Sequence, residues 1–167
     1  MSPIHLFDPK LDIKIERTVD VTPALVWKAW TQPAHLMRWF TPAPWKTIAC
    51  EIDLRPGGKF NTVMQSPEGQ DFPGTGCYLE VVEDKKLVWT DALLAGFRPA
   101  QTESIRPMKP FYFTAMILLE PAGTGTRYTA IGMHGNQADK EQHENLGFSH
   151  GWNAALDQLV AHMKGQK

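Results

Sequence analysis

The stretch "EIDLRPGGKF", Glu51 to Phe60, has two interpretations that lead to different folds. Adjacent glycines before a lysine can cradle a phosphate, or they can turn one β-strand into the next. A phosphate-binding P-loop needs another glycine further back and a serine or threonine after the lysine, but here Gly57 and Gly58 are adjacent and Phe60 follows Lys59. The segment therefore predicts a hairpin turn in which a glycine takes a positive φ.

Apolar and polar residues alternate on both sides of this turn. Ile48, Cys50, Ile52 and Leu54 recur at the period of a half-buried strand. Similar runs separated by Pro- and Gly-rich turn signals predict an antiparallel meander, and an earlier strand precedes it. The predicted strands are residues 11–20, 46–54, 59–65, 76–83, 87–94, 111–120 and 126–134.

Helical signals lie before and after the meander. Thr22 is a predicted N-cap with Pro23 at the first helical position, so a short helix ends before Pro33, and a second one follows at residues 34–40. Residues 138–164 predict one long helix with an apolar face and a polar face. The apolar face holds Asn145, Phe148, Trp152, Ala155, Leu156, Leu159 and Met163. The polar face holds Asp139, His143, His150, Asn153 and Asp157.

The order of elements predicts an α+β fold of the helix-grip type. A curved antiparallel sheet of about seven strands wraps around the long C-terminal helix, and two short helices follow the first strand. Residues 1–10 are predicted to be an N-terminal leader and residues 11–167 a single domain.

Composition excludes several classes of function. The net charge of -1 is spread along the chain, which predicts no nucleic-acid partner, and no apolar run is long enough for membrane insertion. No signal peptide is evident, so a cytoplasmic location is predicted. Cys50 and Cys77 lie in strand segments with a third strand between them and are predicted to be separate thiols.

Candidate catalytic and metal motifs do not assemble in the sequence. "GFSHG", Gly147 to Gly151, matches a hydrolase nucleophile elbow, but Ser149 lies inside the predicted helix rather than after a buried strand. His143 and His150 are two helical turns apart, about 10 Å, which is too far for one ion. The sequence therefore predicts no metal and no cofactor, leaves the catalytic residues unknown, and favours a protein that is not an enzyme.

The aromatic and sulfur-containing side chains are the remaining signal. A meander with a helix laid across it tends to leave space between the two, and large rings with thioethers suit an apolar ligand. The predicted lining of this cavity is Met64, Tyr78, Trp89, Phe113, Met116, Met133, Phe148, Trp152, Ala155, Leu156 and Leu159. Residues 95–110, which contain three prolines, are predicted to be a poorly ordered loop that borders the cavity entrance and does not pair as a strand.

Several segments resemble a known family. They are "IKIERTVDVTPALVWKAWTQPAHLMRWF", "CEIDLRPGGKF", "GCYLEVVEDKKLVWT", "GTRYTA" and "HENLGFSHGWNAALDQLVAHMK", and the most specific motifs are "DLRPGG" and "GFSHGW". Over residues 11–164 the chain is similar to the bacterial branch of the heat-shock-protein-90 ATPase activator homologues. This family lies in the SRPBCC superfamily, with the START-like lipid-transfer proteins, birch-pollen-allergen-like proteins and polyketide cyclases. The resemblance implies the helix-grip fold and a cavity for a small hydrophobic molecule.

Three classes of function remain open. The first is binding of a small hydrophobic or aromatic ligand between the sheet and the C-terminal helix. The second is a cyclase/aromatase- or hydrolase-like enzyme in the same cavity, with His134, Asp91 or Tyr78 in acid–base roles. The third is a stress-related co-chaperone-like interaction module with a chaperone partner. The small residues Gly147, Gly151, Ala154 and Ala161 on one helix strip leave a homodimer open as well.

Overall fold

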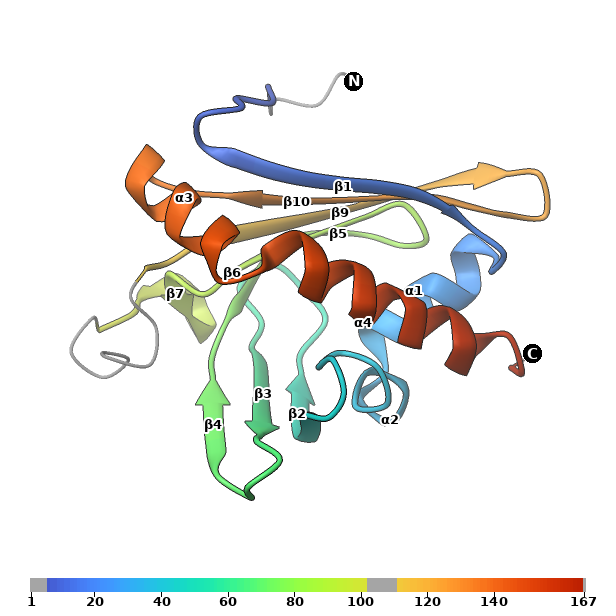
Figure 1. The fold of residues 1–167 in the computed structure, drawn as a ribbon, viewed down its shortest axis with the longest axis horizontal. Coiled ribbons are helices and arrows are strands. Elements are labelled where there is room, and N and C mark those ends of the chain that lie inside the picture. Colours follow the sequence, from blue (N-terminus) through green and yellow to red (C-terminus); the bar gives the residue numbers. More distant parts are fainter. Residues whose placement is uncertain (1–5, 102–110, 167) are drawn as a thin grey trace.

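The computed structural model describes residues 6–101 and 111–166 (Figure 1). The chain forms, in order, β1 (Asp12–Val19), α1 (Pro23–Thr31), α2 (Pro33–Leu36), β2 (Lys46–Ile52), β3 (Phe60–Gln65), β4 (Asp71–Gly74), β5 (Cys77–Val82), β6 (Lys86–Thr90), β7 (Leu93–Leu94), the 3-10 turn η1 (Ala95–Phe97), β8 (Arg98–Pro99), β9 (Thr114–Ala122), β10 (Gly125–Met133), α3 (Gln137–Asn145) and α4 (Phe148–Met163).

The strands form one large sheet and two smaller ones. The five-stranded sheet has the order β1-β10-β9-β6-β5, a three-stranded sheet has the order β2-β3-β4, and β7 pairs with β8. Every pairing is antiparallel. In Figure 1, α4 crosses in front of the strands, with the five-stranded sheet above it and β2 to β4 extending below. The predicted α+β helix-grip fold is confirmed, and β4, β7 and β8 are additional short strands.

The Gly57–Gly58 turn joins β2 to β3 as predicted. Gly57 has a φ of 84°, so the expected positive φ is confirmed. The turn also contacts β5, because the Gly57 amide donates to the Tyr78 carbonyl (2.8 Å) and the Tyr78 amide donates to the Gly58 carbonyl (3.0 Å). The turn therefore links the small sheet to the large one and fixes the backbone of Tyr78.

The first helix begins where the sequence indicates. Thr22 is the N-cap of α1 and its hydroxyl oxygen accepts from the Leu25 amide (3.3 Å), with Pro23 in the first turn. Such a cap satisfies one of the amides that a helix N-terminus leaves without a partner. The helix buries Trp27 and Trp30 in the core.

The predicted long C-terminal helix is broken. Gly147 has a φ of 94° and separates α3 from α4, and its amide donates to the Glu144 carbonyl (2.9 Å) in the manner of a glycine that ends a helix. The prediction of a single helix was wrong, because it extended the phase of α4 through this glycine. The consequence is that His143 does not share the exposed polar face of α4.

The central strands of the five-stranded sheet carry apolar side chains on both faces. On the face toward α4, Ala115 and Ile117 of β9 pack in the main core with Leu156 and Leu159. The alternate residues form a second cluster on the other face of the sheet, which contains Val88, Met116 and Ile131 with Leu79, Leu118 and Met133 packed against them. Alternation along the central strands therefore does not tell the helix-facing side from the outer side.

The predicted loop at residues 95–110 is only partly described, because residues 102–110 lie outside the described part of the chain. Its first residues are ordered by short pairings: β7 pairs with β8, which places Leu93 opposite Pro99. The Gly96 amide also donates to the Gly57 carbonyl (2.8 Å). The expectation that this segment does not pair as a strand was wrong for its first residues, since Pro99 occupies a two-residue strand.

Gln158 of α4 connects the helix to the segment between α2 and β2. Its side-chain nitrogen donates to the carbonyls of Trp39 and Thr41 (both 3.0 Å), and its oxygen accepts from the Ala43 amide (2.8 Å). A side-chain amide can form such contacts in both directions because it holds donors and an acceptor. The segment that carries Trp39 is thereby held against α4.

We expect Gln158→Ala to lower the free energy of unfolding by about 2 kcal/mol, since three hydrogen bonds of about 1 kcal/mol each are lost and water replaces part of them. Urea unfolding followed by fluorescence measures the change. Gln137→Ala is the matched control, because Gln137 is exposed and donates only to Glu141 one turn along α3 (3.0 Å). Equal stabilities of the two variants would contradict a structural role for Gln158.

Candidate functional site

A continuous set of aromatic rings lies between the sheets and α4. We call it the aromatic wall, and it consists of Phe40, Phe60, Tyr78, Trp89, Phe113, Phe148 and Trp152. Phe60 of β3 lies at its centre, with ring centroids 5.6 Å from Phe40, 5.4 Å from Tyr78 and 5.0 Å from Trp89. The wall therefore includes residues of the five-stranded sheet, of the three-stranded sheet, of the segment after α2 and of α4.

The wall continues from the sheet to the helix through Phe113. Its ring centroid lies 5.5 Å from Trp89 and 6.5 Å from Trp152, and Trp152 stacks on Phe148 at 4.9 Å. Most of these rings are buried, but Phe40 and Trp152 are only partly buried. They form the accessible edge of the wall.

Two buried polar atoms of the wall have no hydrogen-bond partner. They are the Tyr78 hydroxyl and the Trp89 indole nitrogen, on residues that are 0% and 6% exposed. Burial raises the pKa of Tyr78 above its usual range, and the nearby Cys50 adds to this effect. Burial, followed by the charge of Glu51, also raises the pKa of Cys50 to about 11, so both groups are neutral at physiological pH.

The predicted lining residues separate into three groups. Six of them lie together in the main core, with Trp152 packed against it: Tyr78, Trp89, Phe113, Ala155, Leu156 and Leu159. Phe148 is buried as well and stacks on Trp152. Met64 lies near the end of β3, in the row of Phe60, and is 37% exposed. Met116 and Met133 belong to the second cluster on the outer face of the sheet, which corrects their assignment to the space under α4. Phe40 and Phe60 belong to the wall, although the lining predicted from the sequence did not include them.

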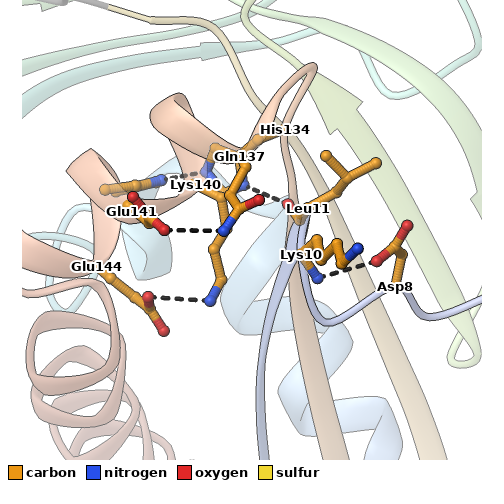
Figure 2. A network of polar contacts seen from close by, with 9 residues as sticks. Asp8, Lys10, Leu11, His134, Gln137, Lys140, Glu141 and Glu144 are labelled. Atoms are coloured by element: carbon orange, nitrogen blue, oxygen red, sulfur yellow. Dashed lines mark hydrogen bonds and ion pairs between the residues drawn. The ribbon is translucent and has the colours of Figure 1, made fainter.

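His134 and His143 form a hydrogen-bonded pair beside the wall. His134 Nδ1 lies 2.8 Å from the Leu11 carbonyl and must donate to it, because a carbonyl oxygen only accepts. In neutral His134 the Nε2 atom then accepts, so His143 Nδ1 donates to it at 2.8 Å. Figure 2 shows His134 between Leu11 and α3, next to the side-chain pairs Gln137–Glu141 and Lys140–Glu144.

His143 is half-buried and packs against three aromatic rings. Its centroid lies 4.7 Å from Phe111, 4.7 Å from Phe113 and 4.8 Å from Phe148. The sequence analysis predicted that His143 lies on the polar face of one long helix. Gly147 is the signal that could have corrected this prediction, because a glycine after a polar helical segment is typical of a C-terminal cap. The pair is therefore adjacent to the wall through Phe113 and Phe148.

Asp91 and Ser149, the other candidates for chemistry, lie in different settings. Asp91 is buried at the end of β6, and its Oδ1 atom accepts from the Phe113 amide at 2.9 Å. Ser149 is exposed in the first turn of α4, which agrees with the rejection of a nucleophile elbow. Within the described ranges, no three His, Cys, Asp or Glu side chains lie close enough to hold a metal ion.

A second histidine pair connects α2 to the last turn of α4. His35 Nδ1 lies 3.0 Å from His162 Nε2. The pKa of His162 is lowered, first by burial of its ring and then by the charges of His35 and Arg38. No local pattern in the sequence predicts this pair, because its members are far apart in the chain.

We expect the free energy of unfolding to fall as the pH drops through about 6.5, the ordinary histidine pKa, toward the lower pKa of folded His162. In that window the unfolded chain binds a proton that the folded protein does not, so acid favours unfolding. Urea unfolding between about pH 8 and about pH 5 measures the slope. His162→Gln should reduce it, whereas the exposed His150→Gln should not; equal slopes in both variants would contradict the expectation.

A surface hollow lies away from the aromatic wall. It is lined by Asp20, Val21, Thr22, Leu25, Thr124, Met163 and Lys164, at the start of α1 and the end of α4. Lys164 and Asp20 face each other across it at 3.6 Å. No helix among residues 6–101 and 111–166 is long and apolar enough to cross a membrane.

Comparison with known proteins agrees with this architecture. A structure from Nitrosomonas europaea is 44% identical, covers 95% of this chain and 97% of its own, and superimposes with a TM-score of 0.88. Structures from Mycobacterium smegmatis (21% identity, 95% and 93% covered, TM-score 0.75) and Arthrobacter aurescens (22%, 98% and 92%, 0.78) share the fold. No curated protein matches the chain. The profile described as "Activator of Hsp90 ATPase homolog 1-like protein" matches residues 20–164, and the chain belongs to this family.

Proposed function

We propose that the protein binds a small hydrophobic or aromatic molecule between the sheets and α4, against the aromatic wall. The observation that carries this proposal is the pair of buried polar atoms, Tyr78 OH and Trp89 Nε1, without partners in the described chain. A buried polar group left unpaired costs about 1–3 kcal/mol, and native proteins pair the large majority of such groups. A bound molecule would supply the missing partners.

The composition of the wall fits such a ligand. Tyr78, Trp89 and Phe113 bring apolar ring surface and few polar atoms, which is the usual character of small-molecule sites. The partly buried Phe40 and Trp152 leave part of the wall accessible to solvent. Membership of a superfamily of ligand-binding scaffolds supports the same function.

Native mass spectrometry of freshly purified protein tests the proposal. We expect an added mass from a non-covalent small molecule that is lost on unfolding, and saturable binding of a naphthalene-based fluorescent dye to the stripped protein. Trp152→Ala should weaken dye binding, because it removes part of the wall. Met133→Ala is the matched control on the outer face of the sheet. Equal loss in both variants, or no saturable binding, would contradict the proposal.

A second candidate is an enzyme that uses the same site for proton transfer. The observation that favours it is the His134–His143 pair, whose members share a hydrogen bond and contact Phe113. Such a pair can take a proton from a carbon next to a carbonyl and return one from water. Exchange of those protons for deuterium in a bound ketone, followed by NMR, tests this role; exchange that is equal in His143→Gln would exclude it.

A chaperone partner is the third possibility. The family description refers to activation of the Hsp90 ATPase, and a stress-related co-chaperone role would need a surface for that partner. The large exposed apolar side chains of the described residues lie on many different elements, including Ile48 on β2, Val82 on β5 and Phe97 on η1. This distribution favours the small-molecule site over a protein-docking surface.

A further inference from the structure

We propose that the ligand of the aromatic wall is an uncharged carbonyl compound, whose oxygen accepts hydrogen bonds from the Tyr78 hydroxyl and the Trp89 indole N–H. This inference rests on the proposed function and adds the chemical class of the ligand. It follows from the kind of polar atoms that lack partners, from their position on the sheet and from the charge of their surroundings.

The two polar residues lie side by side on the face of the sheet toward α4. Tyr78 of β5 and Trp89 of β6 are directly paired across the two strands. Directly opposed side chains on one face have Cβ atoms about 4.5–5.5 Å apart. Both rings also pack on Phe60, with Tyr78 nearly parallel to it (25°) and Trp89 steeply inclined (69°). Both polar groups therefore belong to residues that are paired on one face of the sheet and that contact the same ring.

Other buried aromatic polar groups in this core find partners within the protein. Trp30 Nε1 donates to the Tyr128 hydroxyl (3.1 Å), and Trp39 Nε1 donates to the Ala29 carbonyl (3.0 Å). The chain therefore satisfies these two indole nitrogens within the same core, in contrast to the polar atoms of Tyr78 and Trp89.

Both groups offer a hydrogen to a ligand. An indole nitrogen can only donate, so the partner of Trp89 must be an acceptor. The Tyr78 hydroxyl keeps its proton because burial raises its pKa, and it too can donate. Two donors on one face fit the two lone pairs of a carbonyl oxygen, or the two oxygens of a dicarbonyl ring.

The surroundings favour an uncharged acceptor. Burial and then Cys50 are the causes that raise the pKa of Tyr78, and Cys50 itself is a neutral thiol. Among the described residues, no lysine or arginine makes a cation–π contact with a ring of the wall. The cation–π contact that is present joins Lys14 to Phe7, which is not part of the wall. A carboxylate bound here would be buried without a cation, which is unfavourable.

Three naphthalene probes of similar size test the inference: 2-acetylnaphthalene, 2-ethylnaphthalene and 2-naphthoate. We expect the wild-type protein to bind the ketone about tenfold more tightly than the hydrocarbon, from two hydrogen bonds of modest net strength, and the carboxylate most weakly. The infrared carbonyl band of the bound ketone should shift to lower frequency, as in a hydrogen-bonded ketone.

Two tyrosine variants separate recognition from folding. Tyr78→Phe should reduce the ketone preference to a few-fold and reverse part of the infrared shift, while the protein stays as stable or becomes more stable, since an unpaired buried hydroxyl is removed. Tyr128→Phe removes a hydroxyl that is paired with Trp30, so it should lower stability and leave the ketone preference unchanged. Trp89→Phe should again reduce the preference.

The outcomes distinguish the inference from the proposed function. Equal binding of the ketone and the hydrocarbon would overturn the carbonyl assignment and would indicate that water occupies the two donors. A full preference for the ketone in Tyr78→Phe would also overturn the assignment. Neither result would count against the binding site itself. Tightest binding of 2-naphthoate would overturn the uncharged class. Binding of none of the three probes would count against the proposed function itself and remove the basis of the inference.

Discussion

Gly58→Ala is expected to lower the free energy of unfolding by about 3 kcal/mol or more, because an added Cβ overlaps backbone atoms. A Cβ at Gly58 would collide with the carbonyl oxygen of Asp53 and lie 3.0 Å from that of Arg55. Neither is the end of a flexible side chain, so the turn itself must move. The same turn is hydrogen-bonded to the backbone of Tyr78, and weaker ligand binding should accompany the loss of stability.

Urea unfolding of Gly58→Ala beside Gly151→Ala provides the comparison. Gly151 lies in α4 with nothing within 4 Å of an added Cβ, so alanine there should stabilise the protein by about 0.5–1 kcal/mol through helix propensity. A Gly58→Ala protein as stable as the wild type would contradict the described path of the turn.

Trp30→Ala is expected to cost about 4 kcal/mol, the upper range for removing a buried aromatic ring. Trp30 is 2% exposed, and its ring centroid lies 4.9 Å from Trp39, 5.7 Å from Phe40 and 6.3 Å from Trp152. The substitution leaves a cavity among these rings and removes the hydrogen-bond donor to Tyr128.

Two further variants show how much of the lost stability comes from the hydrogen bond of Trp30 and how much from the packing of its ring. Trp30→Phe keeps most of the ring but removes the donor to Tyr128, and should cost about 1–2 kcal/mol. Trp45→Ala is the control at a partly buried tryptophan, whose ring contact is with Phe72 at 5.4 Å, and should cost less than half as much as Trp30→Ala. Urea unfolding measures all three; a Trp45→Ala loss as large as that of Trp30→Ala would contradict the central position of Trp30.

The parts of the fold that local chemistry determines could be predicted from the sequence. At least one of Gly57 and Gly58 was expected at a positive φ because a turn between two strands requires it, and Thr22 with Pro23 was expected to begin a helix. The buried face of α4 followed from helical phase alone, since Phe148, Leu156 and Leu159 recur on one side.

The positions of the predicted lining residues on the sheet depended on more than alternation. Alternation separates Met116 from Ile117, but both faces of β9 are apolar, so the pattern does not say which one faces α4. Tyr78 and Trp89 were placed correctly on the α4 side, where they are buried in the main core. Their missing partners could not be foreseen, because hydrogen bonding depends on the three-dimensional arrangement.

The two histidine pairs show a different limit of sequence reasoning. His143 was placed on an exposed face because one helical phase was carried through Gly147, and the break turns it toward Phe113 and Phe148. His35 and His162 meet only because α2 packs beside the end of α4, a tertiary contact without a local signal.

The close packing of Trp30, Trp39 and Trp152 also has a spectroscopic consequence. Indole rings 4.9 to 6.3 Å apart have strong ultraviolet transitions that couple with one another, and the sign of the resulting circular dichroism depends on the angle between the rings. The far-ultraviolet spectrum will therefore contain an exciton signal on top of the backbone signal. Helix content calculated from that spectrum will be biased, and the exciton band will report the tertiary arrangement of α1 against α4.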